Sequence, residues 1–525
     1  MRIGEPHIRV LLTSWAAAAA VVVGGFVYTS AATPAIRSDD VLPHIQFLAS
    51  DDMRGRASGS PELEIAADYI ARQFAAAGLQ PGGENGSWFQ PFELDAGFTV
   101  GTGNTVVLRS DSRAITLTLG TSYYPIAAMA NTDAGTPSSS LSGIPLVFAG
   151  YGISAPGLRY DDYEGLDVRG KAVLVLTHEP QETLRTSRLN GDQPIPETSL
   201  SAKALAARNR GALALLVVSD PVHTVDGGNF KGFDLMPDAD SLGLPVLRVS
   251  RDAVGPLLLA WGVDQAARFI DDDLRPRSRA LGRATLDYRE ALTRTRKTVR
   301  NVVGVLPADS GPGRREGREA IVIGAHYDHV GLGGRFSAVP ERTGEIHNGA
   351  DDNASGTASI IAMARAAASD KSRFARALVF VAFAGEERGL LGSTHYASAP
   401  VIPLGDTLAM LNLDMVGRFR GSVDVAGLET APDLTEAVEA AAAVTGTTIR
   451  RSGPGEGRSD DFPFLSARVP ALSFFTGFHR DYHRPTDDWQ RIDAVGVARI
   501  ANLVLDLAAR IAARPDRAEF IPPRR

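Results

Sequence analysis

The stretch 321–414 decides the fold, because it holds three apolar runs that each stop at acidic or histidine residues. The runs are IVIGA at 321–325, ALVFVAFA at 377–384 and TLAMLNL at 407–413. They lead, in turn, into His326-Tyr-Asp328, Glu386-Glu387 and Asp414. Uninterrupted apolar runs that alternate with helical patterns are typical of buried strands in a parallel sheet. We therefore expect an α/β fold in which a mixed, mostly parallel sheet is sandwiched by helices.

The loop between the first two runs adds further acids. It reads HNGADDNASG at 347–356, and it places Asp351 and Asp352 ahead of an alanine-rich helical pattern. Ligands of parallel sheets bind beyond the carboxyl ends of the strands, which is where these acids and histidines lie in the sequence. With the acids that follow the runs this makes six carboxylates, which would repel one another strongly unless cations neutralised them. The pattern predicts a metal site.

Length and composition exclude several classes of protein. A chain of 525 residues is too long for one hydrophobic core, so we expect two or more domains. A net charge of −7 with both signs scattered gives no support to nucleic-acid binding, which usually requires a basic face. The absence of cysteine excludes disulfides, zinc–thiolate sites and cysteine nucleophiles.

The first 35 residues have the pattern of a signal peptide. Arg2 and Arg9 precede an apolar run at 10–27, and small residues follow at 29–35. The alternative is an uncleaved membrane anchor, because the run approaches the length that spans a bilayer. Both alternatives predict export, to the periplasm or the medium, with a membrane contact only through an uncleaved anchor.

The remaining chain divides into two expected domains and a tail. We assign 36–135 to the N-terminal part of a catalytic domain, 136–290 to an inserted smaller α/β domain, 291–515 to the main catalytic part and 516–525 to a frayed tail. A Pro/Ser/Thr/Gly-rich seam at 132–140 suggests the junction. Ser60 is expected to cap a helix that begins at Pro61. The turn with Arg54 and Arg56 is interpreted as a solvated loop.

Each candidate residue also has an ordinary structural explanation. His326 with Asp328 alone is a weak signal, and adjacent acids such as Asp351-Asp352 often cap helices. Glu386-Glu387 and Asp414 are harder to explain, because charges that end buried strands are rarely left unpaired. His483 follows a later apolar run, LSFF at 472–475. Together, two histidines and three or four carboxylates without a thiol suit a pair of divalent ions about 3.5–4 Å apart that share one carboxylate.

The motifs HYDHVG, GADDNASG, FAGEERGLLGS, LNLDMVG and YHRPTDD resemble those of the di-zinc aminopeptidases related to glutamate carboxypeptidase and the transferrin receptor. The resemblance extends over residues 40–510. The inserted segment, with GYGISAP and YDDYEGLDVRGKAVLVL, resembles a protease-associated domain. We expect this insert to limit access to the active site to short peptides.

The resemblance implies a role for each motif. One zinc would be bound by His326 and Asp414, and the other by Glu387 and His483, with Asp351 bridging both. Asp328 would orient His326, and Asp352 would follow Asp351 through a cis peptide bond. Glu386 would be the general base and Tyr482 a hydrogen-bond donor to the oxyanion. Co²⁺ or Mn²⁺ would be possible substitutes for zinc, and His329, His395 and His479 would be structural.

One position departs from the family pattern. Relatives often carry Ser-Asp followed by His or Tyr before Pro-Phe, where this chain has Ser459-Asp460-Asp461-Phe-Pro-Phe. Because this region lines the substrate pocket in relatives, Asp461 would favour either a basic N-terminal residue or the free amine. The alternative is an acid in a solvated loop.

Three functions follow from these expectations. The first is an exported zinc aminopeptidase acting on peptides. The second keeps the site but acts as a carboxypeptidase, a dipeptidase or another amide hydrolase, which would need an arginine such as Arg458 or Arg484 for a C-terminal carboxylate. The third is a non-catalytic, receptor-like protein, which is disfavoured because no expected ligand is missing from the sequence.

Overall fold

The computed structural model describes residues 36–522 apart from 112, 128–139, 190, 192–194, 224–241, 309–318, 335, 340–341, 343 and 454–458. The expected signal peptide, Arg458 and nearly all of the seam at 132–140 therefore lie outside the described residues. Within the described ranges, no helix combines the length and the apolar character needed to cross a membrane.

A nine-stranded sheet is built around the runs that open the sequence analysis. Its order is β1 (Gln80–Pro81), β13 (Leu292–Leu306), β15 (Ala377–Phe383), β14 (Ala320–His326), β16 (Thr407–Leu413), β19 (Ala471–Phe475), β17 (Ser422–Ala426) and β18 (Thr448–Arg451), with β2 (Phe89–Val100) paired to β13. Strand β14 is parallel to β15 and β16, and β16 is parallel to β19. The three runs are thus adjacent parallel strands, as predicted.

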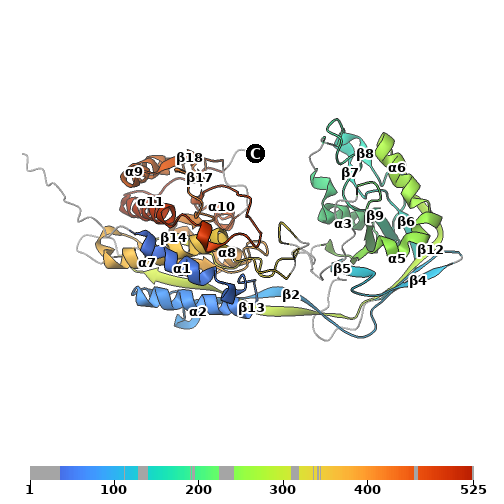
Figure 1. Ribbon diagram of the computed structural model, residues 1–525. Coiled ribbons are helices and arrows are strands. Elements are labelled where there is room, and N and C mark those ends of the chain that lie inside the picture. The colour runs from blue at the N-terminus through green and yellow to red at the C-terminus, as the bar shows by residue number, and fades with distance from the viewer. Residues whose placement is uncertain are drawn as a thin grey trace, which may run out of the picture. The chain divides into compact units, whose positions relative to one another are not determined.

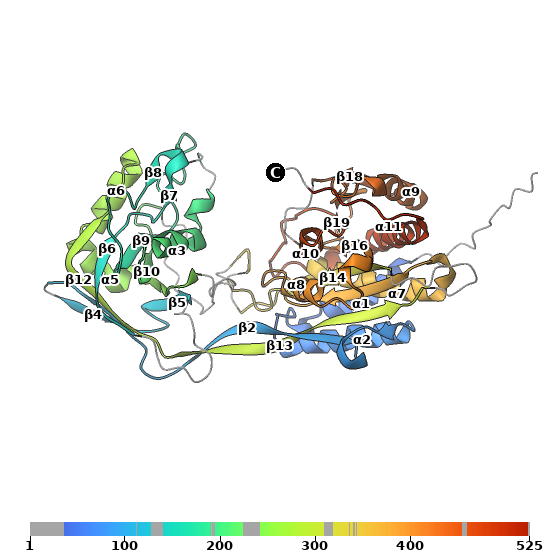
Figure 2. The same cartoon turned by 180° about the vertical axis from the view of Figure 1, so that it is seen from behind.

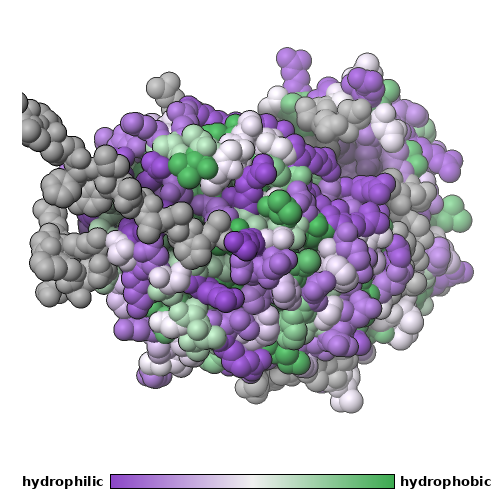
Figure 3. Space-filling model, turned by 60° about the vertical axis from the view of Figure 1, so that its left-hand side comes forward, coloured by the Kyte–Doolittle hydropathy of each residue, from purple (hydrophilic) through white to green (hydrophobic). Residues whose placement is uncertain are grey.

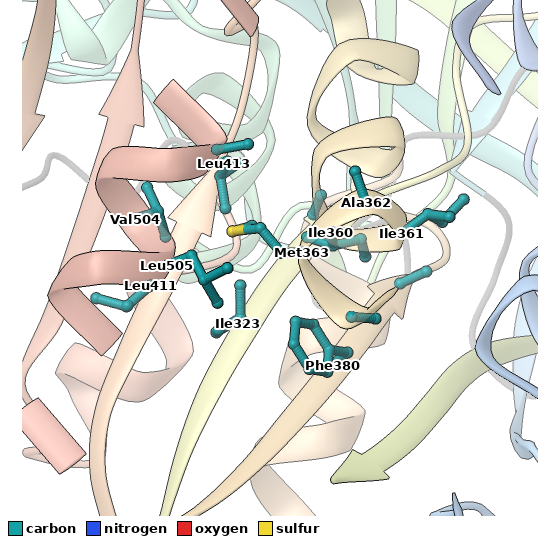
Figure 4. Close-up of a cluster of buried hydrophobic side chains, with 14 of the residues drawn as sticks. Ile323, Ile360, Ile361, Ala362, Met363, Phe380, Leu411, Leu413, Val504 and Leu505 are labelled. Carbon is teal, nitrogen blue, oxygen red and sulfur yellow. The ribbon is translucent and has the colours of Figure 1, made fainter. Parts of the chain in front are cut away.

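Helices cover both faces of this sheet, because its central strands are apolar on both sides (Figures 1 and 2). One face packs against α1 (Ser38–Leu48), α2 (Pro61–Ala76), α7 (Gly356–Ser369) and α11 (Ala494–Ala513). Figure 4 shows part of this layer, where Ile323, Phe380 and Leu411 of the strands meet side chains of α7 and α11. The opposite face, which includes Val322 and Val379, packs against α8 (Leu391–Ser398) and α10 (Phe462–Ser466). Alternation along each strand places neighbouring residues in different cores.

The helix boundaries follow local chemistry. The Ser60 side chain accepts a hydrogen bond from the Leu63 amide at 3.2 Å, so Ser60 caps α2 as predicted.

The outer elements of this region complete its packing and its surface. Helix α9 (Thr435–Thr445) packs against α11. On the face shown in Figure 3, hydrophobic residues are interspersed among hydrophilic ones.

A second sheet of eight strands has its own cores. Its order is β4 (Ala114–Leu117), β3 (Thr105–Arg109), β12 (Arg279–Arg289), β6 (Ser140–Phe148), β9 (Ala172–Leu176), β10 (Ala214–Val218), β11 (Val246–Val249) and β5 (Tyr123–Ala127). The helices α3 (Leu200–Asn209), α5 (Arg251–Ala260) and α6 (Val263–Asp273) accompany it, and a small ribbon pairs β7 (Ser154–Ala155) with β8 (Tyr160–Asp161). Strands β3, β4 and β5 precede residue 136, so this sheet recruits strands from the range 36–135.

Candidate metal centre

The carboxyl ends of four parallel strands bring the acids and histidines together. His326 is the last residue of β14, Glu386 and Glu387 follow β15, Asp414 follows β16, and His483 follows β19. Because neighbouring parallel strands end at the same sheet edge, residues far apart in sequence become neighbours there. Two groups of possible metal ligands result: His326 with Asp352 and Asp414, and His483 with Asp352, Glu387 and His329.

Asp352 belongs to both groups, one carboxylate oxygen facing each. Its Oδ1 lies 3.3 Å from His326 Nε2, which in turn is 3.4 Å from Asp414 Oδ1. Its Oδ2 lies 3.1 Å from His483 Nε2, which is 3.1 Å from Glu387 Oε2. A carboxylate that presents one oxygen to each of two sites is the bridging arrangement of a two-metal centre.

Asp351, which the sequence analysis assigned as the bridge, is instead turned away. Its Oδ2 is 3.0 Å from His479 Nε2, and its Oδ1 accepts a hydrogen bond from the Gly417 amide at 2.5 Å. The carboxylate that faces both groups is therefore one residue later than the predicted bridge, and the cis peptide bond is also later, between Asp352 and Asn353. His479, interpreted as structural, is the partner of Asp351.

Backbone hydrogen bonds of the loop fix which of the two adjacent acids faces the ligand groups. The carboxylate of Asp487 accepts hydrogen bonds from the amides of Asp351 and Asp352 at 2.9 and 3.1 Å. The chain turns into the loop at Gly349, whose φ is +58° and where a Cβ atom would lie 2.3 Å from the Asp352 carbonyl oxygen. Glycine avoids both the unfavourable backbone angle and this clash.

Both histidines present Nε2 to the centre because Nδ1 has another acceptor. His483 Nδ1 is 2.6 Å from the Phe336 carbonyl oxygen, and His326 Nδ1 is 3.2 Å from the Asp328 carbonyl oxygen. A hydrogen bond at Nδ1 leaves Nε2 free to bind a metal. Asp328 thus orients His326 through its backbone oxygen, while its carboxylate lies 3.8 Å from His326 Nδ1 and accepts hydrogen bonds from the Glu386 amide and from Ser58.

The remaining ligand positions are also held in place. Asp414 Oδ2 accepts a hydrogen bond from Ser459 Oγ at 2.7 Å. His329 Nδ1 lies 2.7 Å from Glu387 Oε1, which leaves Oε2 of the same carboxylate facing His483. The sequence analysis interpreted His329 as structural, but this histidine contacts a candidate ligand directly. The sequence feature that could have indicated this contact is the position of His329 three residues after His326.

The electrostatics of the two groups fit divalent cations. Burial lowers the pKa of His326, but the carboxylates of Glu386 and Asp414 outweigh it, so this pKa lies well above the usual value. Burial raises the pKa of Asp352, but the histidines around it outweigh that effect and bring it well below the usual value. The buried carboxylates thus demand positive charge. Imidazole and carboxylate donors without thiolates suit zinc and related divalent ions.

A cavity of about 500 Å³ opens beside the two groups. Its lining includes His326, Asp352, Asp414 and His483 of the candidate ligands, and also Glu386 and Tyr482. Glu386 Oε2 is 4.0 Å from His326 Nε2, so this carboxylate lies next to the ligands without belonging to either group. The Tyr482 ring stacks on the His483 ring with a centroid distance of 3.9 Å. Both residues are placed where a molecule in the cavity would contact them.

The solvated-loop interpretation of the 54–56 turn is wrong for Arg56. This side chain is completely buried, and it donates to the carbonyl oxygens of Leu48, Tyr327, Asn348 and Gly349. It therefore ties the end of β14 to the loop that carries Asp352. The sequence gives little indication of this role, because loop carbonyl groups that need a donor are visible only after folding.

Comparisons with known proteins relate part of this chain to a family of peptidases. The family model described as Peptidase family M28 matches residues 301–508. Aminopeptidase YwaD of Bacillus subtilis is 29% identical over 238 residues, which cover 42% of this chain and 48% of that protein. A probable leucine aminopeptidase of Arthroderma benhamiae is 28% identical over 210 residues, covering 38% of this chain and 56% of the relative. The chain thus spans about half the length of the curated relatives it matches.

Solved structures share the fold. An aminopeptidase from Aneurinibacillus sp. strain AM-1 superposes with a TM-score of 0.59 at 22% identity, covering 94% of this chain and 98% of that one. A zinc aminopeptidase from Bacillus subtilis gives a TM-score of 0.53 at 20% identity, with 90% and 94% covered. The family match includes all the residues of both metal-ligand groups, so the segment 301–508 that carries the candidate metal centre is similar to Peptidase family M28.

Proposed function

We propose that this protein is an exported, zinc-dependent aminopeptidase that releases N-terminal residues from peptides. The observation that carries the proposal is the shared carboxylate of Asp352, which joins two ligand groups at the wall of a cavity that Glu386 also lines. The names of the relatives, aminopeptidases and zinc metalloproteases, support the same reaction class.

The ligand assignment follows the distances. His326, Asp414 and Asp352 would hold one zinc ion, and His483, Glu387 and Asp352 the other. His329 would hold Glu387 in position. When bound, the two ions supply Lewis-acid polarisation of the scissile carbonyl group and of the attacking water.

Glu386 is placed to act as the general base. Its carboxylate lines the cavity next to the ligands but outside both groups, so it is free to accept a proton from water. The same carboxyl group then transfers that proton to the leaving amine. The amide of Glu386 donates to the Asp328 carboxylate at 3.2 Å, which positions the base. Tyr482 lines the same cavity and would donate its hydroxyl hydrogen to the developing oxyanion.

The charge of the cavity favours a substrate amine over a substrate carboxylate. Its lining contains the carboxylates of Asp352, Glu386, Asp414 and Asp461, and, of the residues that the structure describes, no arginine or lysine. Arg484 does not line it, and Arg458 lies outside the described residues. A carboxypeptidase or dipeptidase would need a cation for the C-terminal carboxylate, so this alternative has less support. A receptor-like role has none, because the ligand groups and the base are present.

The test combines metal content with activity. We expect the wild-type protein to hold two zinc ions per chain and to hydrolyse aminoacyl-p-nitroanilides. Glu386→Gln should keep the metal and lose about 10²–10⁴-fold in kcat. If both proteins hold metal but the wild type ignores every substrate with a free amine and cleaves N-blocked peptides, the aminopeptidase assignment is wrong and the amide-hydrolase alternative replaces it.

A further inference from the structure

Asp461 is a buried carboxylate that faces the substrate cavity. The residue is only 4% exposed, and it is among the lining residues of the 500 Å³ cavity beside the metal centre. The solvated-loop alternative of the sequence analysis is therefore wrong. Burying a carboxylate is costly unless the group is paired, protonated or bound to a cation.

The ordinary structural roles of a buried aspartate do not apply to Asp461. It precedes α10, but its side chain makes no capping hydrogen bond to that helix. Among the described residues, no lysine, arginine or histidine is among the groups that shift the pKa of Asp461, and Asp461 belongs to neither metal-ligand group. Burial, with a smaller contribution from Asp414, raises its pKa to about 7, as expected for a carboxylate without a counter-charge. A cation that entered the cavity would supply the counter-charge that this carboxylate lacks.

Another part of the cavity lining is apolar and aromatic. The rings of Phe475 and Phe478 contact each other edge to face at a centroid distance of 5.1 Å, and Phe478 contacts Tyr482 in the same way at 5.0 Å. Tyr482 in turn stacks on the candidate ligand His483. Met415, which follows the ligand Asp414, adds a flexible thioether to the lining. An apolar wall thus begins at the metal centre.

An apolar wall combined with one buried carboxylate complements a long basic side chain. Lysine and arginine place a methylene stem on apolar surface and keep a charged end for a polar partner. We propose that Asp461 selects peptides whose N-terminal residue is lysine or arginine, with the stem along the aromatic wall and the cation at the Asp461 carboxylate. The proposal rests on the aminopeptidase function, and it makes Asp461 a specificity residue rather than a catalytic one.

The test compares two substrates that differ only in the charged group. Lysyl- and norleucyl-p-nitroanilide have the same stem, so their kcat/KM ratio isolates the ammonium group. We expect the ratio to fall about tenfold or more in Asp461→Asn, while norleucyl hydrolysis stays within about threefold, because close charge pairs in desolvated sites are strongly coupled. Glu436→Gln, at an exposed glutamate of α9, is the matched acid-to-amide control and should leave the ratio unchanged.

Two results would overturn the proposal. An unchanged lysyl-to-norleucyl ratio of kcat/KM in Asp461→Asn would show that the Asp461 carboxylate does not bind the substrate side chain. An equal loss for both substrates would show that Asp461 holds the α-ammonium group instead. If Asp461→Asn does not fold, Asp461→Ser removes the same charge with a smaller side chain.

A binding measurement separates this proposal from the proposed function. Zinc-loaded Glu386→Gln should bind L-lysinamide more tightly than L-norleucinamide in titration calorimetry, and the added Asp461→Asn substitution should remove the difference. If the wild type hydrolyses neither anilide but this preference is found, the aminopeptidase function fails and the assignment of Asp461 stands. If norleucyl-p-nitroanilide is hydrolysed but no preference is found, the assignment of Asp461 fails and the function stands.

Discussion

Replacing Arg56 with methionine should destabilise the catalytic sheet region and weaken its metal site. The guanidinium is completely buried and donates to the carbonyl oxygens of Tyr327, Asn348 and Gly349 at 2.9, 2.8 and 3.1 Å, and also to that of Leu48. At about 1 kcal/mol net for each of these hydrogen bonds, the loss comes to about 4 kcal/mol. This agrees with the range of about 3–5 kcal/mol for removing one partner from a buried charged arrangement.

The stem of methionine retains much of the apolar volume, so the change tests mainly the lost donors and the lost charge. Burial lowers the pKa of Arg56 to about 10, and the nearby carboxylates of Asp328 and Asp352 oppose that effect, so the guanidinium is charged at neutral pH. Three of the four acceptors, Tyr327, Asn348 and Gly349, lie on the segments that carry His326 and Asp352, and the fourth, Leu48, ends α1. We therefore expect zinc affinity to fall about 10–100-fold as well, as for other groups that orient metal ligands.

The assay is thermal unfolding of the metal-free proteins, with Arg54→Met as the matched control. The Arg54 side chain is 53% exposed and lies 3.6 Å from Glu62, so its loss should cost less than about 1 kcal/mol. At about 2 °C per kcal/mol, Arg56→Met should lower Tm by about 8 °C. Equal shifts for the two variants, or a shift below about 2 °C for Arg56→Met, would refute the role of Arg56 as a buried tie between these segments.

Three further predictions concern the site itself. Asp352→Asn should reduce the zinc content of both positions, whereas Asp351→Asn should retain more than half of the metal. If metal analysis instead finds the larger loss in Asp351→Asn, Asp351 is the bridge. Removing the metal with a chelator should abolish activity and lower Tm, because the buried carboxylates lose their counter-charge. Added zinc should restore both. Activity that persists after complete metal removal would contradict the metal mechanism. The raised pKa of Asp461, about 7, means that this carboxyl group is neutral below pH 7 and charged above it. The lysyl-to-norleucyl ratio of kcat/KM should therefore rise between pH 6 and 8 in the wild type and stay level in Asp461→Asn; parallel profiles for the two proteins would count against the assignment.

The strands and the edge that carries the site were predictable from local sequence. The runs at 321–325, 377–384 and 407–413 are apolar on both faces, which is the property of central parallel strands covered by helices on both sides. Each run ends in residues that an apolar core does not tolerate, so the positions of His326, Glu387 and Asp414 followed from the pattern. The sequence could not place strands β3, β4 and β5 in the second sheet, because strand pairing between distant segments leaves no local signal.

Tertiary structure decided which of two adjacent acids faces the metal-ligand groups and which single charged residues are buried. Asp351 and Asp352 are adjacent acids of equal chemistry, and only the path of the loop, held by Asp487, decides which carboxylate faces the metal-ligand groups. Arg56 and Asp461 look like surface charges in the sequence, yet both are buried. The physical reason is the same in each case: hydropathy reports the usual environment of a residue type, whereas burial and pairing depend on partners that folding brings from elsewhere in the chain.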